Sequence, residues 1–190
     1  MEKYYFSTSL LHCIKILNSE NVIAYPTESM FALGCDPSSE IAVKKLLNLK
    51  KRSIEKGLIL VASNFDQIKM YINEKCLLKK QRKKMFLHWP GPFTFLLPAH
   101  PKAPYWLTGK FNTIAVRISA HIEIIKLCNA FGKALISTSA NITNMNPCVT
   151  CEELFKVFGK DFPLLHGKIG CNKYPSKIIN IINGKLIRNV

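Results

Sequence analysis

The stretch GLILVA at residues 57–62 is an unbroken apolar run that begins at a glycine. A short run of this composition is typical of a strand buried on both faces of a sheet. Residues 50–56, KKRSIEK, come immediately before it and hold four cations and one carboxylate. Residues 38–49 precede them and have a helical period, with apolar side chains on one face. Helix, basic loop and buried strand in this order indicate a domain that combines α and β structure.

Outward from this stretch, helical periods alternate with short β-branched runs. We expect helices at 7–18, 38–49, 64–71, 76–88, 121–131 and 150–158, strands at 21–25, 57–62, 93–98, 113–118 and 134–138, and a hairpin at 177–187 around an Asn-Gly turn. Strands and helices do not alternate strictly, so we predict an α/β (α+β) fold with a mixed β-sheet flanked by helices. No linker or repeat divides the chain, and residues 1–190 are expected to form a single domain.

Positive charge dominates the composition. Lys and Arg number 27 against 12 Asp and Glu, which gives a formal net charge of +15. A surplus of this size favours binding to polyanions such as nucleotides, nucleic acid or an acidic membrane surface. The hydrophobic fraction of 48% is high enough for a sizeable core and excludes a disordered chain.

The chain has no apolar run near the roughly 20 residues of a membrane span, so we expect no membrane partner. Its first residues, MEKYYF, lack the features of a secretory signal, and we expect a cytoplasmic protein. Seven cysteines, an odd number, are expected to be reduced thiols. Cys148 and Cys151 form a lone C-x-x-C with no second pair at a suitable spacing, so no metal site is predicted.

Four cations are candidates for binding an anion. Lys50, Arg52 and Lys56 lie on the short loop between a predicted helix and a predicted buried strand, where a compact ammonium and a bidentate guanidinium would suit phosphate. The alternative for this loop is a solvated basic turn. Arg117 is different, because it lies in the otherwise apolar strand IAVRI. A charge there faces solvent, pairs with a carboxylate or binds an anionic ligand.

Hydroxyl and amide side chains follow several predicted strands, at positions where α/β proteins commonly bind ligands. The candidates are Thr27, Thr94, Ser137, Ser139, Asn141 and Ser176. The rigid turn WPGP at 89–92 would aim Thr94, and the cluster STSAN at 137–141 suits a phosphate or a ribose. The alternative for each candidate is an ordinary polar turn.

Two common phosphate and metal motifs are missing from the sequence: the glycine-rich Walker loop and H-E-x-x-H. The basic stretch KKQRKK at 79–84 is either a solvated helix face or a contact with nucleic acid.

Taken in order, these segments resemble the YrdC/TsaC family of threonylcarbamoyl-AMP synthases. The matching pieces are AYPTE at 24–28, LKKR at 49–52, KGL at 56–58, WPGPFT at 89–94, AVR at 115–117 and STSAN at 137–141. Each piece is weak alone, but the ordered set over nearly the whole chain is specific. The resemblance implies the single-domain bacterial form, with a twisted mixed β-sheet, flanking helices and a deep, basic, concave cavity.

The resemblance also implies a reaction in which L-threonine, bicarbonate and ATP give threonylcarbamoyl-adenylate and pyrophosphate, which is the work of a nucleotidyltransferase. Mg²⁺ is expected to enter with ATP. Other proteins, the tRNA threonylcarbamoyl-transfer proteins, would then pass the group to an adenosine beside the anticodon of tRNA. Direct binding of tRNA to this chain is left open.

Residue roles follow from the same resemblance. Lys50 and Arg52 are expected to be the catalytic residues that hold ATP phosphates, with Lys56 in support. Ser137, Ser139 and Asn141 are expected to bind the nucleotide, and Thr27, Thr94, Arg117 and Ser176 to bind L-threonine or line its cavity. Arg117 would hold an anionic group, either the substrate carboxylate or a phosphate.

An RNA-binding module is the competing hypothesis. The charge of +15 on a concave surface could hold double-stranded or tRNA-like RNA by shape and phosphate contact. The sequence lacks an aromatic-rich RNP motif and a GXXG loop, the two signatures that would favour this function.

Overall fold

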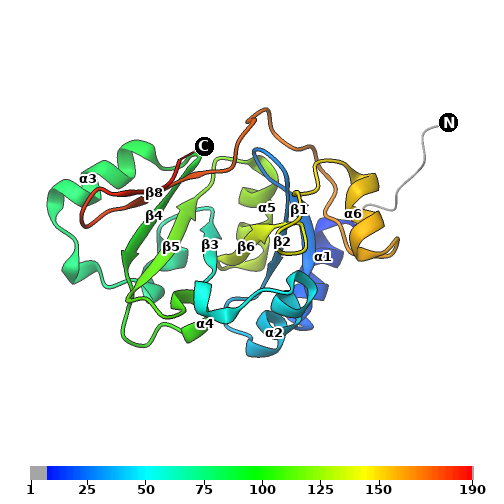
Figure 1. Cartoon of the computed structure of the whole chain (residues 1–190), viewed down its shortest axis with the longest axis horizontal. Coiled ribbons are helices and arrows are strands. Elements are labelled where there is room, and N and C mark those ends of the chain that lie inside the picture. Colours follow the sequence, from blue (N-terminus) through cyan, green and yellow to red (C-terminus); the bar gives the residue numbers. More distant parts are fainter. Residues whose placement is uncertain (1–7, 190) are drawn as a thin grey trace.

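The structure of the protein, a computed structural model, describes residues 8–189. In these residues the strands form one eight-stranded sheet in the order β1-β2-β6-β3-β5-β4-β7-β8 (Figure 1). The strands are β1 Ile23–Pro26, β2 Phe31–Cys35, β3 Ile59–Ala62, β4 Phe93–Pro98, β5 Thr113–Ile118, β6 Leu135–Ser139, β7 Lys177–Asn180 and β8 Leu186–Arg188. The pairs β3–β5 and β4–β7 are parallel and the other neighbours are antiparallel, so the predicted mixed sheet is confirmed.

Helices flank the sheet on both faces. The α-helices are α1 Leu10–Asn18, α2 Glu40–Lys50, α3 Lys79–His88, α4 Tyr105–Thr108, α5 Ile122–Phe131 and α6 Cys151–Phe158, and the 3-10 helices are η1 Ile54–Lys56, η2 Asp66–Tyr71 and η3 Glu74–Cys76. Helices α3 and α6 lie at opposite ends of the molecule (Figure 1). Within the described range, none of these helices has the length and apolar character needed to cross a bilayer.

Each face of the sheet carries its own apolar cluster. The larger cluster includes buried residues of α2, α3 and α6, and it continues along the sheet from β1 to β5. The smaller cluster lies on the other face, where α1 and α5 pack over β1, β2 and the nearest parts of β3 and β6. Because α1 and α5 stop there, the rest of this second face is left for the cavity described below.

Local sequence signals account for several helix ends. The Ser39 hydroxyl accepts a hydrogen bond from the Ala42 amide at 3.1 Å, which starts α2. Thr150 and Glu153 form the capping box expected for α6. Gly132 ends α5 in the left-handed conformation, with φ of 79°, as its position after the helix predicts.

Some sequence predictions were wrong. Residues 64–71 form a 3-10 helix from Asp66 rather than an α-helix, and the helix predicted at 76–88 begins only at Lys79, after a separate 3-10 turn. Pro26 is the last residue of β1, paired with Phe31, although it was expected to stop the strand before itself. The first helix begins at Leu10, and the Ser7 included in its predicted range lies outside the described residues.

The sequence analysis also missed strand β2. All five of its residues are buried, so it has no alternation of polar and apolar side chains to reveal it. Gly34 in this strand is required by packing, because a Cβ there would lie 2.6 Å from both the Ile136 carbonyl oxygen and Tyr25 Cε1. Strand β2 pairs with β1 and β6, and it therefore joins the β1 hairpin to the rest of the sheet.

A buried lysine ties α2 to the segment after β6. Lys50 is the last residue of α2 and only 2% exposed. Its Nζ donates to the carbonyl oxygens of Ser139 at 2.5 Å and Asn141 at 2.9 Å, and to Asn141 Oδ1 at 3.1 Å. Burial, and next the charge of Arg52, lower the pKa of Lys50 from its ordinary value near 10.5 to about 8. Burying this ammonium group costs free energy of desolvation, and the three hydrogen bonds to oxygen acceptors offset that cost.

The stability of the protein should depend on pH through Lys50. The folded state releases the Lys50 proton near pH 8, and the unfolded chain releases it near pH 10.5. Burial of the charge therefore lowers the free energy of unfolding by its full amount below pH 8, and this loss fades as the pH rises toward 10.5. Between pH 7.5 and 9.5 the wild type should gain roughly 1–2 kcal/mol in unfolding free energy relative to Lys50→Met, which cannot titrate. Urea unfolding at both pH values measures this difference, and identical pH dependence in the two proteins would contradict it.

Candidate functional site

A cavity of about 560 Å³ opens on the face of the sheet that α1 and α5 leave uncovered. Strand β5 shows how the sheet builds it. Thr113, Ala115 and Arg117 alternate along the strand and line the cavity, while the residues between them are buried against the opposite face. Strands β3, β4, β6, β7 and β8 add further lining residues. The volume is that of a pocket for one or two small molecules.

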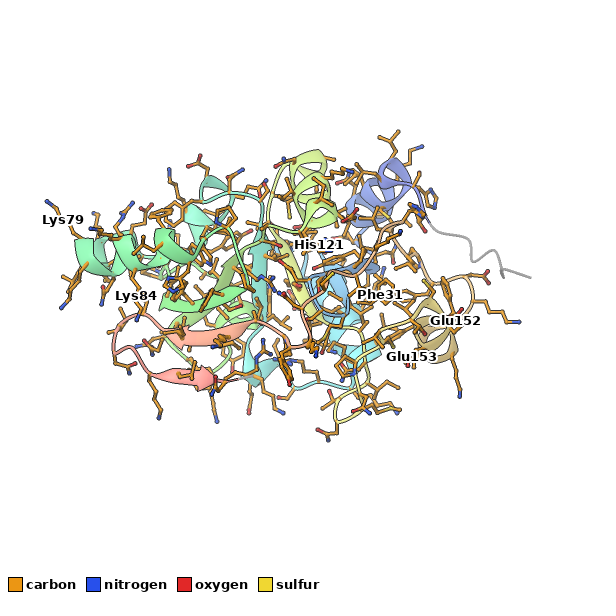
Figure 2. The ribbon with its side chains drawn as sticks, turned by 90° about the horizontal axis from the view of Figure 1, so that it is seen from above. Phe31, Lys79, Lys84, His121, Glu152 and Glu153 are labelled. Carbon is orange, nitrogen blue, oxygen red and sulfur yellow. The ribbon has the colours of Figure 1, made fainter. Side chains whose placement is uncertain are left out.

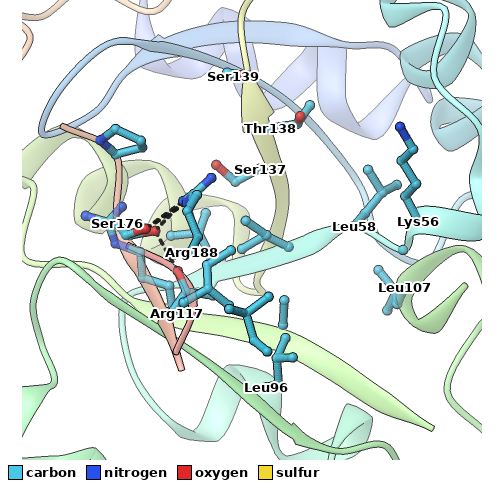
Figure 3. A pocket seen from close by; sticks show the side chains of 18 of the residues that line it. Lys56, Leu58, Leu96, Leu107, Arg117, Ser137, Thr138, Ser139, Ser176 and Arg188 are labelled. Atoms are coloured by element: carbon cyan, nitrogen blue, oxygen red, sulfur yellow. Dashed lines mark hydrogen bonds between the residues drawn. The ribbon is translucent and has the colours of Figure 1, made fainter. Parts of the chain in front are cut away.

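The lining is cationic. Arg52, Lys56, Arg117 and Arg188 belong to it, and the described residues that line it include no aspartate or glutamate. Figure 3 shows Lys56 on one side of the hollow and Arg117 with Arg188 on the other. Four cations around one hollow are suited to a ligand that carries several negative charges.

Arg52 follows the end of α2, on the loop that leads to β3. Lys51 before it adopts the left-handed conformation and turns the chain. Arg52 Nη2 donates to the Gly57 carbonyl oxygen at 2.9 Å, while its Nε is buried and has no hydrogen-bond partner among the described residues. Burial lowers the pKa of Arg52 from its ordinary value. A buried donor without a partner beside a cavity is available to a ligand.

Two hydroxyl groups of the cavity, those of Thr94 in β4 and Ser176 just before β7, contact each other, and Ser176 also contacts Arg188. Thr94 Oγ1 and Ser176 Oγ share a hydrogen bond of 2.8 Å. Arg188 Nε and Nη2 donate to the Ser176 carbonyl oxygen at 3.0 and 2.7 Å, and Nη2 also donates to Ser176 Oγ at 3.1 Å (Figure 3). Burial, and next the charge of Arg117, lower the pKa of Arg188.

The sequence analysis missed Arg188. It ends the short run LIR of β8, so the argument that singled out Arg117 in an apolar strand could have found it. The same analysis included Glu28 only as the last residue of the segment AYPTE and assigned it no role.

Of the three alternatives that the sequence left open for Arg117, the structure shows pairing with a carboxylate, and binding of an anionic ligand stays a prediction. Arg117 lines the cavity, and its Nη2 forms an ion pair with Glu28 Oε1. Its Nε donates to the Gly91 carbonyl oxygen at 3.2 Å, in the turn that the sequence singled out as rigid. Ser119 Oγ donates to the same Glu28 oxygen at 2.6 Å.

The cavity brings together most of the residues proposed from the sequence. The eight that line it are Thr27, Arg52, Lys56, Thr94, Arg117, Ser137, Ser139 and Ser176. Lys50 and Asn141 do not line it, because they lie behind Ser139 and bind to each other. Ser139 Oγ donates to Asn141 Oδ1 at 2.6 Å, so this pair supports a residue of the cavity wall.

The described chain, residues 8–189, contains no group of three or more His, Cys, Asp or Glu side chains that could hold a metal ion. Cys148 is buried and Cys151 is half-buried, and both are free thiols. A metal ion at this site would therefore depend on oxygens brought by a ligand.

Known proteins share this sequence and this fold. The family model Sua5/YciO/YrdC, described as telomere recombination, matches residues 15–189. A threonylcarbamoyl-AMP synthase of Buchnera aphidicola subsp. Acyrthosiphon pisum is 78% identical over 175 residues, covering 92% of this chain and 100% of the relative. A threonylcarbamoyl-AMP synthase of Klebsiella pneumoniae is 49% identical over 96% of each chain.

Solved structures agree with the sequence relatives. The crystal structure of P. abyssi Sua5 complexed with L-threonine has a TM-score of 0.85 and 25% identity, covering 94% of this chain and 53% of that chain. The crystal structure of E. coli YciO has a TM-score of 0.77 over 92% of this chain and 90% of that chain, and at 21% identity it supports the fold alone. Because the family model covers nearly the whole sequence and the relatives align along it, this chain belongs to the Sua5/YciO/YrdC family.

Proposed function

We propose that this protein is a threonylcarbamoyl-AMP synthase, an ATP-dependent nucleotidyltransferase that forms L-threonylcarbamoyladenylate and diphosphate from L-threonine, bicarbonate and ATP. The observation that carries the proposal is a cavity lined by four cations and several hydroxyls with no carboxylate in its described lining. The relatives that bear this name, and the related Sua5 structure with L-threonine, give the same chemistry.

The proposed reaction needs such a cavity because its reactants repel each other. The threonine amine combines with bicarbonate to give a carbamate and water. A carbamate oxygen then attacks the α-phosphate of ATP, the P–O bond to the β-phosphate breaks, and diphosphate leaves with its electron pair. Preorganised cations offset the repulsion between the two anions and stabilise the charge that develops on the departing diphosphate. An enclosed site also limits hydrolysis of the labile carbamate and adenylate.

We assign roles by position in the cavity. Arg52 and Lys56 are assigned to the phosphates, and Ser137 and Ser139 to the nucleotide, since all four line the cavity. Thr27, Thr94, Arg117 and Ser176 are assigned to L-threonine. Arg117 and Ser176 lie across the cavity from Lys56 (Figure 3), and Thr94 is hydrogen-bonded to Ser176. Lys50 and Asn141 belong to the nucleotide site through Ser139, which they hold from behind. Proximity and charge supply most of the proposed catalysis.

Mg²⁺ enters as part of the ATP substrate in this proposal. The cavity lining offers hydroxyl and amide oxygens but no carboxylate among its described residues, so phosphates and water would supply most of the ligands. Mg²⁺ would neutralise part of the triphosphate charge and leave the remainder to the arginines and Lys56.

The product is an activated group that other proteins must use. We propose that the tRNA threonylcarbamoyl-transfer proteins consume it in the cytoplasm, where ATP and tRNA are available, to modify the adenosine beside the anticodon. A mixed anhydride with AMP hydrolyses readily, so rapid transfer is favoured.

The purified protein should release diphosphate from ATP when L-threonine and bicarbonate are both present. Omitting either should abolish release, and L-serine should give a kcat/KM lower by about tenfold or more, because one missing methyl in a fitted pocket costs roughly 1–3 kcal/mol. A coupled diphosphate assay with mass spectrometry of the adenylate measures this. Diphosphate release that ignores threonine would contradict the assignment.

Arg52 and its neighbour Lys51 provide a matched pair of substitutions. Arg52→Gln removes a cavity cation and should lower kcat/KM by about 10²–10³, the usual loss for one electrostatic donor. Lys51→Gln removes an equal charge from an exposed position outside the cavity and should leave activity within about twofold. Equal effects of the two substitutions would show that the general charge, and not the cavity, matters.

One surface feature favours an additional contact with tRNA. Helix α3 carries exposed lysines at 79, 80, 83 and 84, and no ion pair is formed by any of the four within the described structure. Lys79 and Lys84 project from α3 at one end of the molecule (Figure 2). We propose that this face contacts tRNA phosphates, as a supplement to the catalytic function.

Retention of tRNA should then fall steeply with salt, because each neutralised phosphate releases counterions with a slope of about −0.9 for a duplex. Changing the four α3 lysines to Gln should reduce that slope by about 2–4. A control replaces the four exposed lysines at 15, 126, 156 and 160, which gives the same change in net charge. If both variants show the same salt slope, α3 is not the site that contacts tRNA. The rate of adenylate formation should respond only mildly to salt in the wild type and in both variants.

A further inference from the structure

Glu28 is a carboxylate that pairs with Arg117, one of the four cations of the cavity. It follows Thr27 after β1 and lies just behind the lining, with its side chain 14% exposed. Its Oε1 pairs with Arg117 and accepts a hydrogen bond from Ser119 Oγ. We infer that Glu28 is a positioning residue: it fixes the guanidinium of Arg117 and thereby sets the affinity of the cavity for the substrate carboxylate. This inference rests on the proposed function.

The contacts of Arg117 leave its orientation little freedom. Its Nε donates to the Gly91 carbonyl oxygen and its Nη2 faces Glu28, so two edges of the planar group are held. The remaining N–H donors are left for a ligand in the cavity that Arg117 lines. A guanidinium fixed in this way loses less freedom when it binds a carboxylate than a mobile one would, because its fork geometry is already set.

Glu28 itself is held from several directions. The Asn172 amide donates to the Glu28 carbonyl oxygen at 2.9 Å, and the Gly170 amide donates to that of Thr27 at 2.9 Å. A Cβ at Gly170 would lie 2.9 Å from the Glu28 carbonyl oxygen, so the segment around 170 packs closely over this turn. The backbone that carries Glu28 is therefore fixed, and Ser119 Oγ holds the carboxylate itself.

Charge supports the same role. Arg117 and Arg188 lie on the same wall, and the charge of Arg117 contributes to the lowered pKa of Arg188. A carboxylate paired with one of two neighbouring arginines reduces their repulsion before substrate arrives. The lining itself keeps its positive character, because Glu28 lies outside it.

Glu28 acts through Arg117 and does not contact the substrate. Its second oxygen, Oε2, is buried and has no hydrogen-bond partner in the described structure. Because Glu28 does not belong to the cavity lining, we assign it no part in taking the proton of the threonine amine. Its chemistry is limited to holding the arginine.

Glu28→Gln keeps the shape and removes the charge. We expect the KM for L-threonine to rise about tenfold, which corresponds to the loss of one charge-assisted contact, while the KM for ATP and kcat change less than about threefold. Glu123→Gln is the matched control: Glu123 is also largely buried, at 18% exposed, and it pairs with His121 at 3.2 Å and does not line the cavity. This control should leave both KM values unchanged. A loss of thermal stability without a change in the KM for threonine would overturn the inference.

Two further measurements separate positioning from folding and from the reaction itself. In an Arg117→Met background, Glu28→Gln should no longer raise the KM for threonine, and it should restore stability by removing an unpaired buried charge. An equal rise in KM in both backgrounds would overturn the inference. Crystal structures without substrate should show the Arg117 guanidinium displaced in Glu28→Gln. An unmoved guanidinium would overturn the inference about Glu28, whether or not the protein makes the adenylate. Failure of the wild type to make the adenylate, by itself, would count only against the proposed function.

Discussion

Repulsion between like charges is the constraint that the rest of this structure must satisfy. Arg52, Lys56, Arg117 and Arg188 surround one cavity whose described lining has no carboxylate. Each of the three arginines donates to a backbone carbonyl oxygen, that of Gly57, Gly91 or Ser176. Carbonyl oxygens fix the direction of a guanidinium and leave its full charge in place. The fold therefore orients the cations without neutralising them, and within residues 8–189 only Arg117 of the four has a carboxylate partner.

The sheet makes this arrangement possible through its two unequal faces. One face carries a continuous apolar core, and the other is covered by α1 and α5 only over β1, β2 and the nearest parts of β3 and β6. Side chains that alternate along β5 fill the core with Ile114, Val116 and Ile118 while they place Arg117 in the cavity. Core packing and cation placement thus come from the same strand. A shift of its register by one residue would turn the apolar side chains toward the cavity and Arg117 toward the core.

Local patterns predicted the parts of the fold that have local causes. Strands β4 and β5, the α6 capping box and the glycine at the end of α5 agree with the sequence, because alternation and capping are readable in a few residues. Strand β2 was missed because burial on both faces leaves no alternation. The sequence placed a loop between α2 and β3, as the structure does, but Lys50, expected on that loop, is the last residue of α2 and is buried behind Ser139. Whether a cation at a helix end faces a ligand or a carbonyl depends on packing from β6, which lies about 90 residues away.

The fold alone does not determine the chemistry. Solved chains less than 25% identical share this architecture, and one fold commonly supports several functions. What distinguishes a site is its lining, and here the four cations come from β5, from the end of β8 and from the segment between α2 and β3. These positions can change without disturbing either apolar cluster. Under the function proposed here, specificity depends on a small set of arginines and hydroxyls, and on the groups, such as Glu28, that hold them in place.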